Sequence, residues 1–107
     1  MDKVIFQAES AVDEACTNVI KYAYNGNPGF LKVSVNKQDD TMVITINDRG
    51  KPFDPNSIAM PDIKSNLDNR KTGGLGIFII KKMMDSISHY YDPQTGNTLV
   101  MKKKFTK

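Results

Sequence analysis

Two polar side chains near the start of the chain, Glu14 and Asn18, stand four residues apart. In a helix this spacing places both on one face, one turn apart. A glutamate carboxylate there is a candidate proton acceptor for a hydroxyl or a water, and the carboxamide oxygen of Asn18 is a candidate ligand for Mg²⁺. The same spacing is common on solvated helix faces, so the pair alone leaves both interpretations open.

A glycine-rich stretch, Gly73-Gly-Leu-Gly76, runs directly into an apolar segment that ends near Asp85. Backbone amides without side-chain bulk at the start of a helix suit phosphate oxygens. A close approach between backbones explains such glycines equally well. The spacing matches neither the dinucleotide-binding Gly-x-Gly-x-x-Gly pattern nor a P-loop, so those two folds are not indicated.

Asp48 follows an alternating apolar segment and precedes a stretch with one glycine and two prolines, so it stands at the end of a predicted strand. Its carboxylate is able either to accept a hydrogen bond from the exocyclic amine of adenine or to cap the turn that follows. Gly50, two residues further on, would let a flat ring approach the backbone.

The elements that must position these groups follow from the hydrophobic periodicity. Helices are predicted over about residues 3–24 and from the glycine stretch to residue 85, with strands over 30–36, 42–47, 86–91 and 98–105. Residues 56–72 are polar and poorly periodic, which favours a surface flap over a short helix. This order predicts an α+β fold, a two-layer sandwich of a mostly antiparallel sheet with helices on one face.

Length and composition limit the classes of protein. The 107 residues fit one domain, and the net charge of +3 comes with four lysines in the last six positions, which argues only weakly for nucleic acid. The single cysteine, Cys16, excludes an intrachain disulfide, and the single histidine, His89, has no ligand partners at zinc spacing. With no signal peptide and no apolar run of ~20 residues, we expect a cytoplasmic protein without membrane contact.

The polar motifs together resemble those of a known family. Asp13-Glu-Ala-Cys-Thr-Asn18, Asp48-x-Gly-x-x-Phe-Asp-Pro55 and the run from Gly73 to Asp85 are similar, in this order, to the N, G1 and G2 boxes of the GHKL ATPase superfamily. The closing Gly96-Asn-Thr-Leu99 fits as well. Within the superfamily the chain most resembles the anti-sigma-factor serine/threonine kinases, over about residues 9–105.

This resemblance implies a Bergerat-type sandwich that binds ATP, or ADP, with Mg²⁺. Glu14 would be the general base and Asn18 the Mg²⁺ ligand. Asp48 and Gly50 would recognise adenine, with help from the hydroxyl of Thr98. The phosphates would be bordered by Gly73, Gly74, Leu75 and Gly76, and residues 56–72 would form the ATP lid.

The family's reaction transfers the γ-phosphoryl group of ATP to a serine or threonine of a small STAS-type anti-sigma-factor antagonist. The resemblance therefore implies a protein kinase that also sequesters a regulatory partner, such as a sigma factor. The alternative is a nucleotide-sensing binding module with little or no kinase activity. A histidine-kinase catalytic domain is disfavoured because no phospho-accepting histidine helix precedes the boxes.

Relatives of this type usually carry a longer segment before the first box, which forms an opening strand and helix. The domain, residues 1–107, is thus expected to be shortened at its N-terminus relative to the family. We expect apolar surface on Phe6, Val12 and Val19, or on the sheet opposite them, to lack its cover. A homodimer is predicted, because association commonly buries such a patch.

Overall fold

The computed structural model describes residues 2–55 and 74–105. The elements are α1 (Asp2–Asn18), the π-helix η1 (Val19–Ala23), β1 (Leu31–Gln38), β2 (Thr41–Asp48), α2 (Gly74–Met83), β3 (Ser86–Asp92) and β4 (Gly96–Lys104). The predicted order of helices and strands is confirmed. The flap predicted over residues 56–72 and the first glycine of the glycine stretch, Gly73, lie outside the described residues.

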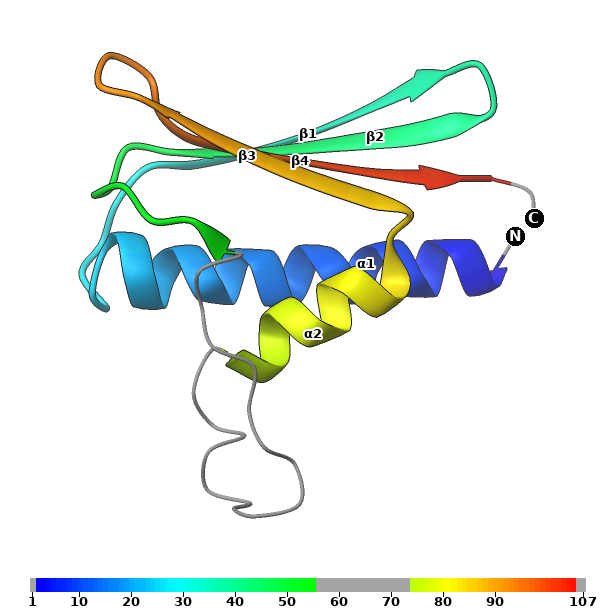
Figure 1. The fold of residues 1–107 in the computed structure, drawn as a ribbon, viewed down its shortest axis with the longest axis horizontal. Helices are drawn as coiled ribbons and strands as arrows, with labels where there is room; N and C mark the ends of the chain where they lie inside the picture. The colour runs from blue at the N-terminus through cyan, green and yellow to red at the C-terminus, as the bar shows by residue number, and fades with distance from the viewer. Residues whose placement is uncertain (1, 56–73, 106–107) are drawn as a thin grey trace.

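The four strands form one antiparallel sheet in the order β1-β2-β4-β3, and both helices lie on the same face of it (Figure 1). A two-residue turn joins β1 to β2, with Asp39 at a φ of 57°, a conformation that aspartate tolerates. This architecture is the predicted two-layer α+β sandwich. Neither helix in the described ranges is long and apolar enough to cross a membrane.

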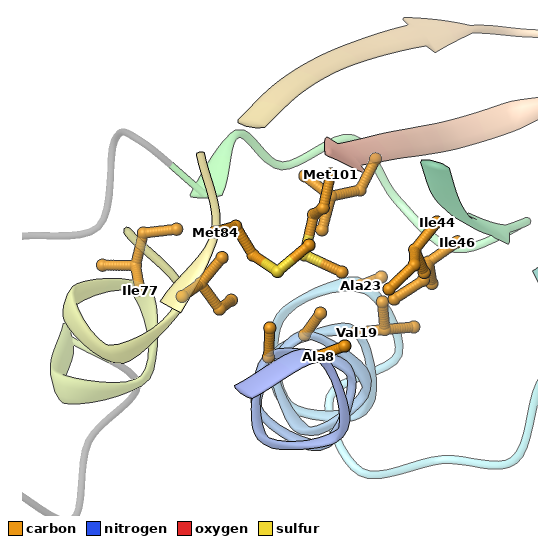
Figure 2. Packing of buried hydrophobic residues seen from close by; sticks show 12 residues of the cluster. Ala8, Val19, Ala23, Ile44, Ile46, Ile77, Met84 and Met101 are labelled. Atoms are coloured by element: carbon orange, nitrogen blue, oxygen red, sulfur yellow. The ribbon is translucent and has the colours of Figure 1, made fainter. Parts of the chain in front are cut away.

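The core lies between the sheet and the two helices (Figure 2). α1 contributes mostly small side chains to it, including Ala8, Ala11 and Ala15, so its axis lies close to its neighbours. Ile77 and Ile80 of α2 belong to the same core cluster, and α2 packs against α1. The predicted apolar stripe of the first helix is therefore the surface on which the rest of the domain packs.

Alternation along β2 and β4 decides which side chains lie beneath the helices. The helix-facing pairs across these strands are Ile44 with Met101, Ile46 with Leu99, and Asp48 with Asn97. The neighbouring pair, Asn47 with Thr98, points to the opposite, open face of the sheet. The polar pair Asp48 and Asn97 thus continues a row of core residues to the end of the sheet.

β1 forms one edge of the sheet, and its helix-side residues are poorly covered. Val33 and Val35 are 43% and 61% exposed, and they line an apolar groove of about 490 Å³ between β1 and α1. Val12 lines this groove and is half-buried, while Phe6, elsewhere on α1, is 64% exposed. The predicted uncovered apolar surface is confirmed there, but the prediction is wrong for Val19, which is a core residue.

Candidate functional site

Asp48 is the last residue of β2 and is 2% exposed. Its Oδ1 accepts hydrogen bonds from the backbone amide of Gly50 and from Nδ2 of Asn97, each 2.9 Å long. Within the described part of the chain, both hydrogen bonds to this carboxylate end on Oδ1, so Oδ2 keeps its acceptor capacity. Asp48 therefore caps the turn, as one of the two interpretations predicts, and still has an oxygen to offer to a ligand.

The loop after Asp48 is packed against the end of the first helix. A β-carbon at Gly50 would lie 2.5 Å from the carbonyl oxygen of Ala23, and the amide of Lys51 donates a 3.0 Å hydrogen bond to that oxygen. The need for glycine at this position thus comes from the protein's own backbone. The approach of a flat ring to this backbone stays a prediction.

Asn18 ends α1, immediately before the π-helical turn, and is 2% exposed. Its Nδ2 is buried and has no hydrogen-bond partner among residues 2–55 and 74–105. Buried polar atoms are nearly always paired, so an orphaned amide points to a partner outside the protein. Rotation of the carboxamide exchanges nitrogen and oxygen, which lets the same position present an oxygen to Mg²⁺. The residue therefore fits the predicted cation ligand.

Glu14 lies one turn before Asn18 on the same face of α1 and is half-buried. The small pocket around Asp48 does not include Glu14. The structure thus brings Asn18 and Asp48 to one pocket and leaves Glu14 beside it, on the side of Asn18 toward the start of the helix. The role of Glu14 as a general base stays a prediction.

The pocket lies between α1 and the end of the sheet. Its lining residues are Ala15, Asn18, Val19, Ile46, Asp48, Phe53, Pro55, His89, Asn97 and Leu99. Its cavity measures about 10 Å³, room for about one water molecule. Phe53 lies at its wall, with its ring centroid 5.9 Å from that of Tyr22 and 6.1 Å from that of His89. A cavity of this volume is too small for a purine ring.

The glycine stretch is helical in its described part. α2 begins at Gly74, so Gly74, Leu75 and Gly76 form the first turn of that helix and not a loop before it. The first amides of a helix have no partners within the helix. The structure therefore places these amides at a helix N-terminus, the arrangement predicted for phosphate oxygens.

Thr98 does not line this pocket, and its role in holding adenine stays a prediction. Its Oγ1 lies on the open face of the sheet, where Nδ2 of Asn47 donates a 3.3 Å hydrogen bond to it. Asn97, one residue earlier, faces the pocket in its place. Adjacent strand residues point to opposite faces of a sheet, which explains why Asn97 lines the pocket and Thr98 does not.

Sequence reasoning missed Asn97 and His89 as site residues. Nδ2 of Asn97 donates to the carbonyl of Lys51 at 2.8 Å as well as to Asp48, while Oδ1 accepts from the amide of Phe53 at 3.2 Å. Nε2 of His89 lies 3.1 Å from the same Oδ1. The signal was the alternation of Asn97 with Leu99 and Met101, which puts all three on the core face.

The antiparallel sheet is covered by two helices on one face, and Asn18 at the end of α1 and Asp48 at the end of β2 line one pocket. This arrangement defines a class of protein. The chain belongs to the histidine kinase-like ATPase domain family, whose model matches residues 2–103. The GHKL resemblance seen in the sequence is therefore confirmed.

Individual relatives extend this result. The chain is 37% identical over 109 residues to the serine-protein kinase RsbW of Staphylococcus aureus, covering 96% of this chain and 67% of that protein. RsbW of strain MSSA476 is 36% identical with the same coverage. The fold is also similar to the histidine kinase AdeS of Acinetobacter baumannii, with a TM-score of 0.54 and 20% identity, over 94% of this chain and 47% of that one.

Proposed function

We propose that this domain is an ATP-dependent protein serine/threonine kinase of the anti-sigma-factor type. Its substrate is a STAS-type anti-sigma-factor antagonist, and it sequesters a regulatory partner such as a sigma factor. The similarity to proteins named serine-protein kinase RsbW over nearly the whole chain supports the kinase class. The observation that carries the proposal is the buried Asn18, whose Nδ2 has no partner among the described residues, in the same pocket as the acceptor Asp48.

Each residue has a distinct role in this proposal. Oδ2 of Asp48 accepts a hydrogen bond from the exocyclic amine of adenine. The oxygen of Asn18 would hold Mg²⁺, which would supply positive charge next to the phosphates. The amides of Gly74 to Gly76 bind phosphate oxygens at the N-terminus of α2. Leu75 lies in the same helical turn.

The transfer step uses Glu14 as the general base. Its carboxylate takes the proton of the substrate serine as the serine oxygen bonds to the γ-phosphorus. The bond from that phosphorus to the bridging oxygen breaks, and ADP leaves. The protein's contribution is then mostly positioning and charge, because little covalent chemistry falls to it in a loose transition state.

We also propose that two copies associate through the uncovered groove between α1 and β1. Ile5, Val33 and Val35 are exposed there beside the acidic Glu9 and Asp13, and β1 is an edge strand whose outer backbone groups pair with no strand in the described sheet. Exposed apolar patches of this kind usually mark an interface. Light scattering over a range of concentrations tests this; a monomer mass at every concentration would rule it out.

The kinase proposal is tested with labelled ATP, Mg²⁺ and a purified STAS-type antagonist. Glu14→Gln should lower phosphoryl transfer by at least about 100-fold, the range of general-base effects, while ATP affinity changes little. Asp39→Asn on the exposed β1–β2 turn is the matched control and should transfer at the wild-type rate. Transfer by Glu14→Gln at the control rate would exclude Glu14 as the base.

A nucleotide-sensing module is the second candidate. The pocket of about 10 Å³ must enlarge when a nucleotide binds, and a change of shape on binding is what a sensing module uses to alter its affinity for a partner. In that case ATP alters the affinity for a protein partner without phosphoryl transfer. The same assay separates the two functions. Wild-type protein that binds ATP and Mg²⁺ but transfers nothing to any antagonist supports the module.

A further inference from the structure

We propose that Asn97 and His89 are a positioning pair that holds the Asp48 carboxylate and makes this pocket prefer purines with an amino group over purines with an oxo group. The inference rests on the proposed binding of nucleotide at Asp48. Neither residue is assigned a contact with the ligand. Each acts through Asp48 and the loop that follows it.

The orientation of the Asn97 carboxamide is determined by two backbone groups. The amide of Phe53 is able only to donate, and the carbonyl of Lys51 is able only to accept. Oδ1 of Asn97 must therefore face Phe53, and Nδ2 must face Lys51. Since Nδ2 also reaches Asp48 at 2.9 Å, Asn97 presents an N–H group to that carboxylate.

All of the hydrogen-bonding capacity of Asn97 is then used inside the protein. Nδ2 has two hydrogens, which go to Lys51 and Asp48, and Oδ1 has two lone pairs, which face Phe53 and His89. No donor or acceptor remains for a ligand. Asn97 therefore connects the end of β4 to the loop after Asp48 and sets the position of both.

The oxygen of Asn97 also determines the tautomer of His89. Because Oδ1 is an acceptor, Nε2 of His89 at 3.1 Å must carry a hydrogen. Neutral His89 is thus the Nε2–H tautomer. Its ring lies on the pocket wall, 6.1 Å from the ring of Phe53. The histidine supplies the fourth partner, which completes the network.

This network has a consequence for ligand selection. Two N–H groups, from Gly50 and Asn97, hold Oδ1 of Asp48, so rotation of the carboxylate is restricted and Oδ2 is left as an acceptor. An acceptor in that place favours a ring with an exocyclic amino group. An oxo group there would leave two acceptors facing each other, and mismatched buried polar groups are strongly rejected.

The test compares the affinities for ATP and for inosine triphosphate by titration calorimetry of the wild type and three variants. His89→Phe keeps a ring and removes the donor, whereas His89→Gln keeps an N–H near the position of Nε2. We expect His89→Phe to weaken the binding of ATP about fivefold to tenfold, the effect of one hydrogen bond. The binding of inosine triphosphate should weaken by less than about twofold. His89→Gln should restore the wild-type ratio, and Ser88→Ala, exposed on the other face of β3, should not change it.

A second measurement does not depend on nucleotide. His89 is the only histidine of the chain, so its ring nitrogen signals in a ¹⁵N NMR spectrum are assigned without ambiguity. The expected pattern is that of the Nε2–H tautomer in free wild-type protein. The Nδ1–H tautomer would overturn the proposal. Nε2 of His89 would then be an acceptor, so Asn97 would have to turn its Nδ2 group, and not Oδ1, toward it.

The outcomes separate this proposal from the proposed function. If wild type binds ATP but His89→Phe weakens both nucleotides equally, the positioning role is wrong and nucleotide binding stands. If wild type binds neither nucleotide, the proposed function and the ligand preference both fail, whichever tautomer is observed. A selective loss of ATP in His89→Phe, rescued in His89→Gln, supports the pair.

Discussion

A β-carbon added to Gly50 would lie 2.5 Å from the carbonyl oxygen of Ala23 and 2.6 Å from its β-carbon. The loop after β2 therefore packs closely against Ala23, the last residue of the π-helix η1, five residues beyond Asn18. The amide of Lys51 donates a hydrogen bond to the same carbonyl. The helix that carries the proposed cation ligand and the strand that carries the proposed adenine acceptor are therefore held together by their own backbones.

Gly50→Ala should therefore lower both stability and nucleotide affinity. The added methyl group meets backbone atoms that have little room to shift, and overpacking of this kind costs about 1–3 kcal/mol. Urea unfolding measures the loss of stability, and ATP titration of the folded protein measures the loss of affinity.

Gly26→Asn provides the matched control for Gly50→Ala. Gly26 has a φ of 84° and nothing within 4 Å of an added β-carbon, and asparagine tolerates positive φ. It should lose less than about 1 kcal/mol and keep its ATP affinity. Equal losses in the two variants would contradict the steric explanation.

Most of the fold follows from the sequence because the periodic signals are strong and agree with one another. The alanines of α1 and the alternation of β2 each indicate one element and one buried face. The strand ends were less certain, and β4 begins two residues before the predicted position because Gly96, at a φ of 87°, still pairs with Asp92. The sequence predicts a turn at this glycine, whereas in the structure Gly96 is already paired with the neighbouring strand.

The site was predictable only in part. Asn18 and Asp48 are side chains of unusual type at the ends of regular elements, so spacing and position identify them. Asn97 lines the pocket and its neighbour Thr98 does not, because their side chains point to opposite faces of the sheet. The π-helical turn after Asn18, which aims Val19 and Ala23 at the sheet, has no sequence signal of its own.

Asn18→Leu should raise stability while it abolishes Mg²⁺-dependent binding of nucleotide. The carboxamide is buried without a partner for Nδ2, and removal of such a group gains roughly 1–3 kcal/mol. The comparison variant is Asn97→Leu, in which an amide with four internal partners is lost, and it should be less stable than wild type. Thermal unfolding without ligand measures both. A loss of stability in Asn18→Leu would mean that its amide is already satisfied inside the protein.

Tyr24 connects three segments through its hydroxyl group. Its Oη donates to the carbonyl of Phe30 at 2.6 Å and accepts from the amide of Arg49 at 2.8 Å. Tyr24→Phe removes both hydrogen bonds and should cost about 1–3 kcal/mol of unfolding free energy. Tyr90→Phe, on the open face of β3 and 58% exposed, is the control and should cost less than about 0.5 kcal/mol. Equal effects in urea unfolding would show that the Tyr24 hydroxyl contributes nothing.

Cys16 is a half-buried thiol on α1, and burial, followed by the negative charge of Asp13, raises its pKa above the ordinary value of 9.0. Only the thiolate reacts with alkylating agents, so at pH 8.5 the folded protein should react with iodoacetamide at least about threefold more slowly than the urea-unfolded chain. Asp13→Asn removes the charge but keeps the burial, so its folded form should react faster than the folded wild type. Equal rates in these two proteins would leave burial as the whole cause.

The same shift in pKa predicts how stability changes with pH. The folded thiol has the higher pKa, so the unfolded chain loses its proton first as the pH rises above 9.0. The stabilisation is fully present below that pH and is lost as the pH rises through the folded pKa. Cys16→Ser does not titrate in this range, so the free energy of unfolding of wild type should fall more steeply between pH 9 and 10.5 than that of Cys16→Ser, with urea unfolding as the measurement. Parallel curves would mean that the thiol ionises equally readily in both states.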